Sequence, residues 1–133
     1  MELRVLVIDD DAIFNLMTDA VLRNIGITAH PKCFTCGQEA LTYIIQENNL
    51  DITYLVFLDI NMPTISGWEV LGQLQQLPIR HRIHVVMVTS SIDRADKNRA
   101  SEFEQVIDYM VKPLKREKLA TLKQHKKIVP FFS

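Results

Sequence analysis

The chain has 133 residues, which suffices for one domain with a hydrophobic core and is too short for that domain plus a second, output domain. Its 15 Lys and Arg against 16 Asp and Glu leave a net charge of -1, which excludes a global field that attracts nucleic acid or an acidic membrane surface. No signal sequence follows Met1, and no apolar run approaches the roughly 20 residues of a membrane helix, so we expect a cytoplasmic protein without a membrane partner.

The chain begins with the pattern of a buried strand followed by a helix. Residues 3–8 are a β-branched run, and the acids Asp9 to Asp11 after them would gather a metal ion. A helix is expected over residues 12–24, with one of two neighbouring apolar stripes facing the sheet. One stripe consists of Phe14, Met17, Val21 and Ile25, and the other of Ile13, Leu16 and Ala20.

A second strand and helix are expected next. Gly26 stops the first helix, and Pro31 would confine a weak strand over residues 27–34 to the edge of the sheet. Thr35 begins a sequence with the form of a capping box, which predicts a helix start. The buried face of that helix should consist of Ala40, Leu41, Ile44 and Ile45, and Asn48 and Asn49 should close it.

The third expected strand should lie at the centre of the sheet. An apolar run over residues 55–58 stops at Asp59, which is typical of a buried strand delivering one carboxylate to a loop at its carboxyl end. Ser66 opens a second capping box, and Pro78 ends the helix that follows. Trp68, Leu71 and Leu74 should face inward on this helix.

Two further strand and helix pairs complete the chain. Residues 83–88 and 106–111 are strand-like, the first ending in the hydroxyls of Thr89, Ser90 and Ser91. The helix expected over 93–101 has almost nothing apolar to bury and should be held loosely. The last helix should turn Leu114, Leu119 and Leu122 inward. We expect a domain over 1–127 and an apolar tail over 128–133, which either packs back or binds a partner.

Five successive strand and helix pairs predict an α/β fold with a parallel sheet covered on both faces. With the Pro31 strand at the edge, the strand order 2-1-3-4-5 makes the first and third strands neighbours. In such a sheet, ligands bind beyond the carboxyl ends of the strands. The side chains expected to converge there are Asp9, Asp10, Asp59, Thr89 and Lys112.

Four motifs in this order resemble the receiver domain of two-component response regulators, similar in size to the stand-alone chemotaxis type. They are Ile8-Asp9-Asp10, Leu58-Asp59-Ile60-Asn61-Met62-Pro63 with Gly67, Val88-Thr89-Ser90, and Tyr109-Met110-Val111-Lys112-Pro113. The resemblance covers nearly everything from Leu3 to about Lys126. It implies a flavodoxin-like, doubly wound (βα)5 fold, and a signalling protein that catalyses only its own phosphorylation and slow dephosphorylation.

The resemblance also implies a phosphorylation site. Asp59 would accept a phosphoryl group from a phosphohistidine donor. Asp9 and Asp10 would hold Mg²⁺ together with Asp59 and the backbone carbonyl of Asn61, and Mn²⁺ could substitute. Oxygen ligands of this kind suit Mg²⁺, and three carboxylates without a metal would repel a phosphate. Lys112 and the Thr89 hydroxyl would contact the phosphoryl oxygens.

Further expectations concern the switch and the partners. Thr89 and Tyr109 would form a switch that alters the face of the fourth helix, fifth strand and fifth helix, and the Lys112-Pro113 bond would be cis. The partners would be a sensor histidine kinase or histidine phosphotransfer protein, docking on Ile13, Leu16 and Ala20, and an unknown downstream protein. The protein would be a monomer or a phosphorylation-dependent dimer. No DNA-binding segment follows the last helix, so nucleic acid is not expected as a partner.

Other interpretations remain open for several of these residues. Asp9 and Asp10 could be a helix N-terminal acid cluster favoured by the helix dipole, and Tyr109 could serve only the core. Cys33 and Cys36 have the form of a redox pair, and His30 beside them suggests zinc, but three ligands are fewer than a structural zinc site needs.

Three other functions compete with the phosphorylated receiver. One is a Mg²⁺-dependent phosphohydrolase with an Asp nucleophile, but these enzymes usually carry a second Asp where this chain has Asn61, which cannot transfer a proton. A flavin-binding protein needs a glycine- and hydroxyl-rich phosphate loop after the first strand, where this chain has three acids. The third is a receiver-like docking module that acts without phosphorylation.

Overall fold

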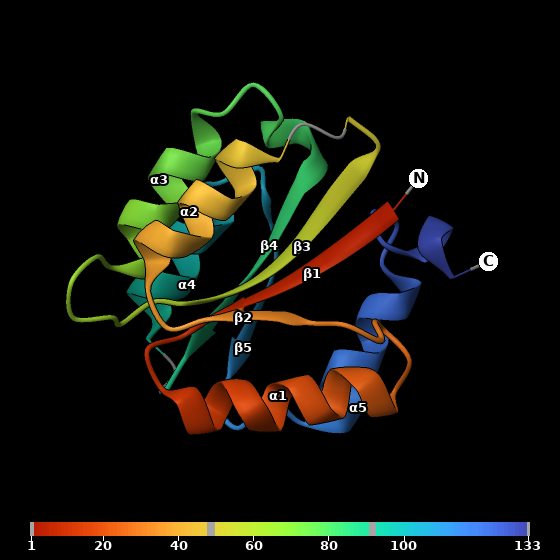
Figure 1. Cartoon of the computed structure of the whole chain (residues 1–133). Helices are drawn as coiled ribbons and strands as arrows, with labels where there is room; N and C mark the ends of the chain where they lie inside the picture. The colour runs from red at the N-terminus through yellow and green to blue at the C-terminus, as the bar shows by residue number, and fades with distance from the viewer. Residues whose placement is uncertain (1, 48–49, 91–92, 133) are drawn as a thin grey trace.

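The computed structural model describes residues 2–47, 50–90 and 93–132. In this part of the chain five parallel strands form one sheet in the order β2-β1-β3-β4-β5 (Figure 1). The strands are β1 (Glu2–Ile8), β2 (Lys32–Phe34), β3 (Ile52–Asp59), β4 (Ile83–Thr89) and β5 (Val106–Val111). The α/β fold and the strand order predicted from the sequence are confirmed.

Helices cover both faces of the sheet. They are α1 (Ala12–Asn24), α2 (Gly37–Gln46), α3 (Gly67–Gln75), α4 (Arg94–Ser101) and α5 (Arg116–Ala120), with short 3-10 turns η1 (Arg80–Arg82), η2 (Thr121–Gln124) and η3 (Val129–Phe131). Helices α2, α3 and α4 lie on one face, and α1 and α5 lie on the other (Figure 1). None of these helices is long and apolar enough to cross a membrane.

The two central strands form the core, since every residue of β3 and β4 is buried. Tyr54, Val56 and Leu58 pack on the side of α2 and α3, whereas Leu55 and Phe57 alternate onto the side of α1 and α5. Strand β1 pairs with β3 along its whole length, from Glu2 opposite Ile52 to Ile8 opposite Leu58. This register places Asp9, which follows β1, next to Asp59, the last residue of β3.

Helix α1 has the predicted bounds, but neither predicted stripe is its buried face. Met17 is 59% exposed, so its assignment to a sheet-facing stripe together with Phe14 is wrong. The fully buried positions are instead Asn15, Thr18 and Leu22, with Phe14, Val21 and Ile25 half-buried. The helix takes this rotation because the Asn15 side chain donates to two strand-end carbonyls, at 2.9 Å from Asp9 O and 3.3 Å from Phe34 O.

The start of α2 differs from the predicted capping box at Thr35. The N-cap is Cys36, and its side chain makes no capping hydrogen bond. Close packing governs this start, because a Cβ on Gly37 would lie only 2.6 Å from Val70 Cγ2. Ile45, predicted to be inward, is 56% exposed, since the buried line of α2 passes through Gly37, Ala40, Leu41 and Ile44. The predicted end at Asn48 and Asn49 lies outside the described residues, as do Ser91 and Ser133.

The capping box at Ser66 is confirmed for its N-cap, because Ser66 Oγ accepts a hydrogen bond of 3.2 Å from the Glu69 N–H at the start of α3. Trp68 is half-buried against the core, and Leu71 and Leu74 are fully buried. In α4, Ala100 is the one buried residue of the helix. In the last helical segment Leu119 and Leu122 are buried, and Leu114, which precedes α5, is half-buried.

Strand β2 differs in extent from the sequence expectation, and the structure shows where the C-terminal tail packs. Strand β2 is at the edge, as Pro31 predicts, but it comprises only three residues rather than the span 27–34. Ile128 is fully buried in the core beneath α1 and α5, and Phe132 packs against the same core. Lys123 Nζ also donates to Ile25 O at 2.6 Å. Ile128 and Phe132 therefore pack back on the domain.

Candidate functional site

Three acids meet at the carboxyl end of the sheet. Asp9 follows β1 and is 1% exposed, Asp59 ends β3 and is 4% exposed, and Asp10 is exposed. One carboxylate oxygen from each lies within 4.8 Å of the others. Asp11, the third acid of the run, is not part of this cluster. It caps α1 by accepting from Ile13 N at 2.9 Å and Phe14 N at 3.2 Å.

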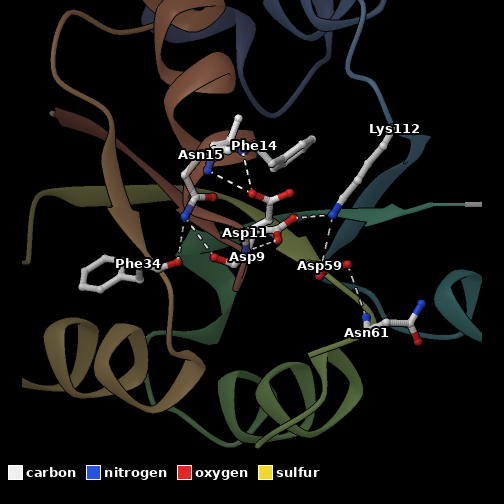
Figure 2. A network of polar contacts seen from close by, with 9 residues as sticks. Asp9, Asp11, Phe14, Asn15, Phe34, Asp59, Asn61 and Lys112 are labelled. Carbon is white, nitrogen blue, oxygen red and sulfur yellow. Dashed lines mark hydrogen bonds and ion pairs between the residues drawn. The ribbon is translucent and has the colours of Figure 1, made fainter. Parts of the chain in front are cut away.

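Hydrogen bonds hold the Asp9 carboxylate in place (Figure 2). Asp9 Oδ1 accepts from the Asp11 N–H at 2.9 Å, and the Asp9 N–H donates to Phe34 O at 3.0 Å. The Asn15 side chain then joins the Asp9 and Phe34 carbonyls, as described for α1. Sequence reasoning missed this positioning residue. A polar residue set among the apolar positions of α1, six residues after Asp9, was the available signal.

The loop after Asp59 folds tightly over the end of β3. Asp59 Oδ1 accepts from the Asn61 N–H at 3.3 Å, and the Gly67 N–H donates to Ile60 O at 2.9 Å. A Cβ on Gly67 would lie 2.2 Å from the backbone oxygen of Asp59 and 2.8 Å from Ile60 Cα. Only glycine permits this approach of α3 to the strand end, so Gly67 fixes the position of the Asp59 loop.

Lys112 brings the positive charge of the site. Its Nζ lies 2.6 Å from Asp9 Oδ2 and 3.8 Å from Asp59 Oδ2, so its closer partner is Asp9 (Figure 2). The ammonium also lies 4.4 Å from the centre of the Phe14 ring. The Lys112 N–H donates to Thr89 O at 2.8 Å, and the Lys112-Pro113 peptide bond is cis, the isomer that the resemblance implied.

The charges at this site are not balanced by the protein alone. Burial raises the pKa of Asp59 to about 6, and the neighbouring Asp9 carboxylate adds to the shift, while Lys112 and the Asn61 N–H oppose it. Three carboxylates facing one ammonium suit a hard divalent cation, because Mg²⁺ prefers oxygen ligands and carboxylates in particular. The residues present therefore fit the predicted metal.

The two predicted switch residues lie on β4 and β5. Thr89 is buried at the end of β4, and Tyr109 is half-buried against the α2–α3 core. Burial raises the pKa of the Tyr109 hydroxyl, the Asp96 carboxylate adds to the shift, and the nearby Thr89 side chain opposes it. The structure records no hydrogen bond from the Thr89 or Tyr109 side chain to Asp59 among the described residues.

The remaining predicted residues are also placed. Ile13 and Leu16 are 70% and 72% exposed on α1, and Ala20 is exposed beside them. Cys33 and Cys36 are free thiols. Within residues 2–47, 50–90 and 93–132, the Asp9, Asp10 and Asp59 cluster is the one group that could hold a metal ion, so the zinc alternative with His30 has no site there.

The comparison with protein families agrees with this geometry. The model of the response regulator receiver domain matches residues 5–124. This chain belongs to that family. Receivers are normally non-enzymatic modules of two-component signalling, and the family implies a histidine kinase or phosphotransfer partner in general.

Known structures and relatives resemble this receiver over most of its length. A two-component response regulator from Cytophaga hutchinsonii has a TM-score of 0.85 and 28% identity, with 96% of this chain and 97% of that chain covered. The probable methanogenesis regulatory protein FilR2 of Methanothrix harundinacea is 27% identical over 117 residues, which are 86% of this chain and 75% of FilR2.

A third relative is much longer than this receiver. The two-component response regulator-like protein PRR37 of Oryza sativa subsp. indica is 29% identical over 124 residues. The match covers 92% of this chain but only 16% of PRR37.

Proposed function

We propose that this receiver accepts a phosphoryl group on Asp59 from the phosphohistidine of a kinase or phosphotransfer protein. The observation that carries the proposal is the position of the Asp59 carboxylate. It is buried at the end of the central strand, in a cluster with Asp9 and Asp10, and Lys112 Nζ faces both buried carboxylates. Other arrangements of acids at a helix start would not need a half-buried lysine beside them.

In the proposed reaction, an Asp59 carboxylate oxygen attacks the phosphorus of the phosphohistidine. The new P–O bond forms as the P–N bond breaks, and the electron pair of that bond returns to the imidazole nitrogen. Phosphoryl transfer depends mainly on alignment and on positive charge near the transferred oxygens, which Lys112 can supply. Mg²⁺ or Mn²⁺, held by the three acids and the Asn61 carbonyl, would neutralise further charge on those oxygens.

The acyl phosphate should then persist long enough to act as a signal. Asn61 follows Asp59 by two residues, and its backbone N–H is used to hold the Asp59 carboxylate. Its amide side chain cannot act as a general acid or base, so water attack on the phosphoryl group has no strong protein catalyst at this position. This composition favours a signalling receiver over a phosphohydrolase.

Phosphorylation should change the conformation of Thr89, Tyr109 and α4. The Tyr109 hydroxyl is buried near the Thr89 side chain, and α4 buries only Ala100. A tyrosine hydroxyl that lies near Thr89 and a helix with little apolar contact are elements that a small change at Thr89 can rearrange. We expect the rearranged face of α4, β5 and α5 to contact the downstream protein or to favour a dimer.

The test is the binding of beryllofluoride, a phosphoryl mimic, with and without Mg²⁺. Trp68 serves as the probe, because it lies in the first turn of α3 next to the Asp59 loop, stacks on Phe103, and has the Arg99 guanidinium 4.4 Å from its ring centre. We expect a saturable, Mg²⁺-dependent change in fluorescence and in the Tyr109 NMR signals. In Asp59→Asn, labelling by acetyl phosphate should fall by at least about 100-fold. A folded protein with no response would instead favour the docking module that acts without phosphorylation.

The donor protein should dock on the exposed stripe of α1 formed by Ile13, Leu16 and Ala20. This stripe lies beside the acids, because α1 begins three residues after Asp9. Leu16→Glu places a charge at the centre of the stripe and should slow transfer from a phosphorylated histidine protein by roughly 10-fold. Labelling by acetyl phosphate, which needs no docking, should not change. Equal loss in both assays would contradict the docking surface.

A further inference from the structure

A pocket lies at the end of the sheet opposite the Asp59 cluster. This pocket of about 630 Å³ lies where β4 and β5 begin, between the η1 turn and the chain after η2. The acids of the candidate phosphorylation site follow the other ends of the parallel strands. We call this site the basic pocket, for the lining residues Arg80, His81, His84, His125, Lys126 and Lys127.

The basic pocket concentrates positive charge in a chain whose net charge is -1. Its lining contains three permanent cations and three of the four histidines of the chain, against the single carboxylate of Glu104. A cleft lined by one sign of charge focuses the electrostatic potential and raises the local concentration of ions of opposite sign. The physical expectation is therefore an anionic occupant.

Two histidines of the pocket have side chains whose orientation or proton position is fixed by neighbouring groups. His84 is 8% exposed, and it alternates on β4 with Ile83 and Val85, which pack against the α2–α3 core. It therefore faces the side covered by the chain after η2. His125 Nδ1 accepts from the Lys127 N–H at 3.1 Å, so a neutral His125 ring carries its proton on Nε2 and can donate from there.

Neutral polar groups accompany the cations. The Gln105 side-chain amide donates to Arg80 O at 3.0 Å and to Leu74 O at 3.4 Å, which ties β5 to the η1 turn. Gln105 Oε1 is buried and has no hydrogen-bond partner among the described residues. Glu104 beside it offers further acceptor oxygens. Such acceptors suit the amino and hydroxyl groups of a nucleoside, which inorganic phosphate lacks.

We propose that the basic pocket binds a small phosphate-bearing molecule of about mononucleotide size. Arg80, Lys126 and Lys127 would contact the phosphate, because guanidinium and ammonium groups are its usual protein partners. The pocket volume lies in the range of about 300–1,000 Å³ that is typical of small-molecule sites. This site shares no residue with the Asp59 cluster, so it goes beyond the proposed phosphoryl transfer and does not depend on it.

The experiment is an NMR titration of the whole chain with AMP and, separately, with inorganic pyrophosphate, in buffer without divalent cations. The ring signals of His81, His84 and His125 report on the basic pocket, and the backbone signals of Asp59 and Lys112 report on the other end of the sheet. We expect saturable shifts at the histidines and none at Asp59, with AMP binding more tightly than pyrophosphate.

Matched variants separate the basic pocket from general surface charge. Lys126→Gln and Arg80→Gln should each weaken AMP binding by about 3- to 10-fold, while Lys97→Gln, which removes an exposed charge from α4 outside the pocket, should leave it unchanged. Thermal melting checks that each variant is folded. Asp59→Asn should not alter AMP binding, and Lys126→Gln should not alter labelling by acetyl phosphate.

Several results would overturn the proposal. Equal weakening by Lys97→Gln would show a general charge effect, and pyrophosphate binding as tight as that of AMP would show that any anion is accepted. A single-stranded oligonucleotide that binds far more tightly than AMP would indicate an extended nucleic-acid surface in place of a small-molecule pocket. Absence of shifts at the three histidines at millimolar AMP would exclude the site.

Discussion

The two ends of the sheet bury ionisable groups in opposite ways. At the carboxyl end, Asp59 is buried beside another carboxylate, and its pKa is raised to about 6. At the amino end, burial lowers the pKa of His84 to about 4, and the charges of Lys127 and His125 lower it further. Near neutral pH His84 is neutral, the form that its surroundings favour, whereas Asp59 is ionised, the form that its surroundings disfavour. An added cation would therefore stabilise the ionised Asp59 at the carboxyl end, but it would not stabilise the neutral His84 at the amino end.

The two ends should therefore respond to pH with opposite signs. A carboxyl group whose pKa is raised on folding binds a proton more readily in the folded state, so folding becomes more favourable as the pH falls from about 6 toward 4. A histidine whose pKa is lowered on folding is protonated more readily in the unfolded state. Its contribution to stability is complete above pH 6.5 and is lost as the pH falls toward 4.

The largest expected effect tests the tight loop at the carboxyl end. Gly67→Ala should lower the free energy of unfolding by more than about 3 kcal/mol, because the added Cβ would lie 2.2 Å from the Asp59 backbone oxygen and the backbone must move. Gly72→Ala is the matched control in the same helix. It meets nothing within 4 Å and should stabilise the protein by roughly 0.5–1 kcal/mol. Equal urea midpoints for the two variants would contradict the close approach.

The next effect tests the amino end. Because the pKa of His84 falls to about 4 from 6.5, acidification from pH 7 to pH 4 should remove about 3 kcal/mol of stability through this residue. His84→Gln, which does not titrate, should show a correspondingly flatter pH profile in urea unfolding. His81→Gln changes an exposed histidine and should keep the wild-type profile. A wild-type slope in His84→Gln would show that another group causes the acid sensitivity.

The smallest of the three expected effects tests the raised pKa of Asp59 at the carboxyl end. Without divalent cations, Asp59→Asn should raise the free energy of unfolding by at most about 3 kcal/mol at pH 7, because it removes a carboxylate whose folded pKa is raised to about 6. The gain should shrink toward pH 4, where the wild-type carboxyl is protonated in the folded state. Added Mg²⁺ should narrow the difference by stabilising the wild type. Destabilisation by Asp59→Asn at pH 7 would refute the assigned shift.

Much of the fold was accessible from the sequence because it depends on local patterns. Apolar runs that end in acids or hydroxyls predicted the strands, and Pro31 placed β2 at the edge and so fixed the strand order. The convergence of Asp9, Asp10 and Asp59 followed from that order alone. Parallel strands bring their carboxyl ends together whatever the connecting helices contain.

The features that sequence reasoning missed depend on contacts between distant segments. The rotation of α1 is set by Asn15, whose partner Phe34 lies in another strand, and apolar periodicity alone suggested Met17 in its place. The start of α2 depends on Gly37 packing against Val70 of α3. The basic pocket joins the starts of β4 and β5 to residues after η2, and no motif links these segments in the sequence.

The hydrophobic core of this receiver extends beyond the residues that the family model matches. The family match ends at residue 124, but the core continues to Ile128, whose side chain is fully enclosed, and Phe132 packs against the same face. When receivers are recombined with other modules, a junction placed at residue 124 would sever an apolar anchor and leave a hole beneath α1 and α5. A chimera joined there should melt earlier than one joined after Phe132.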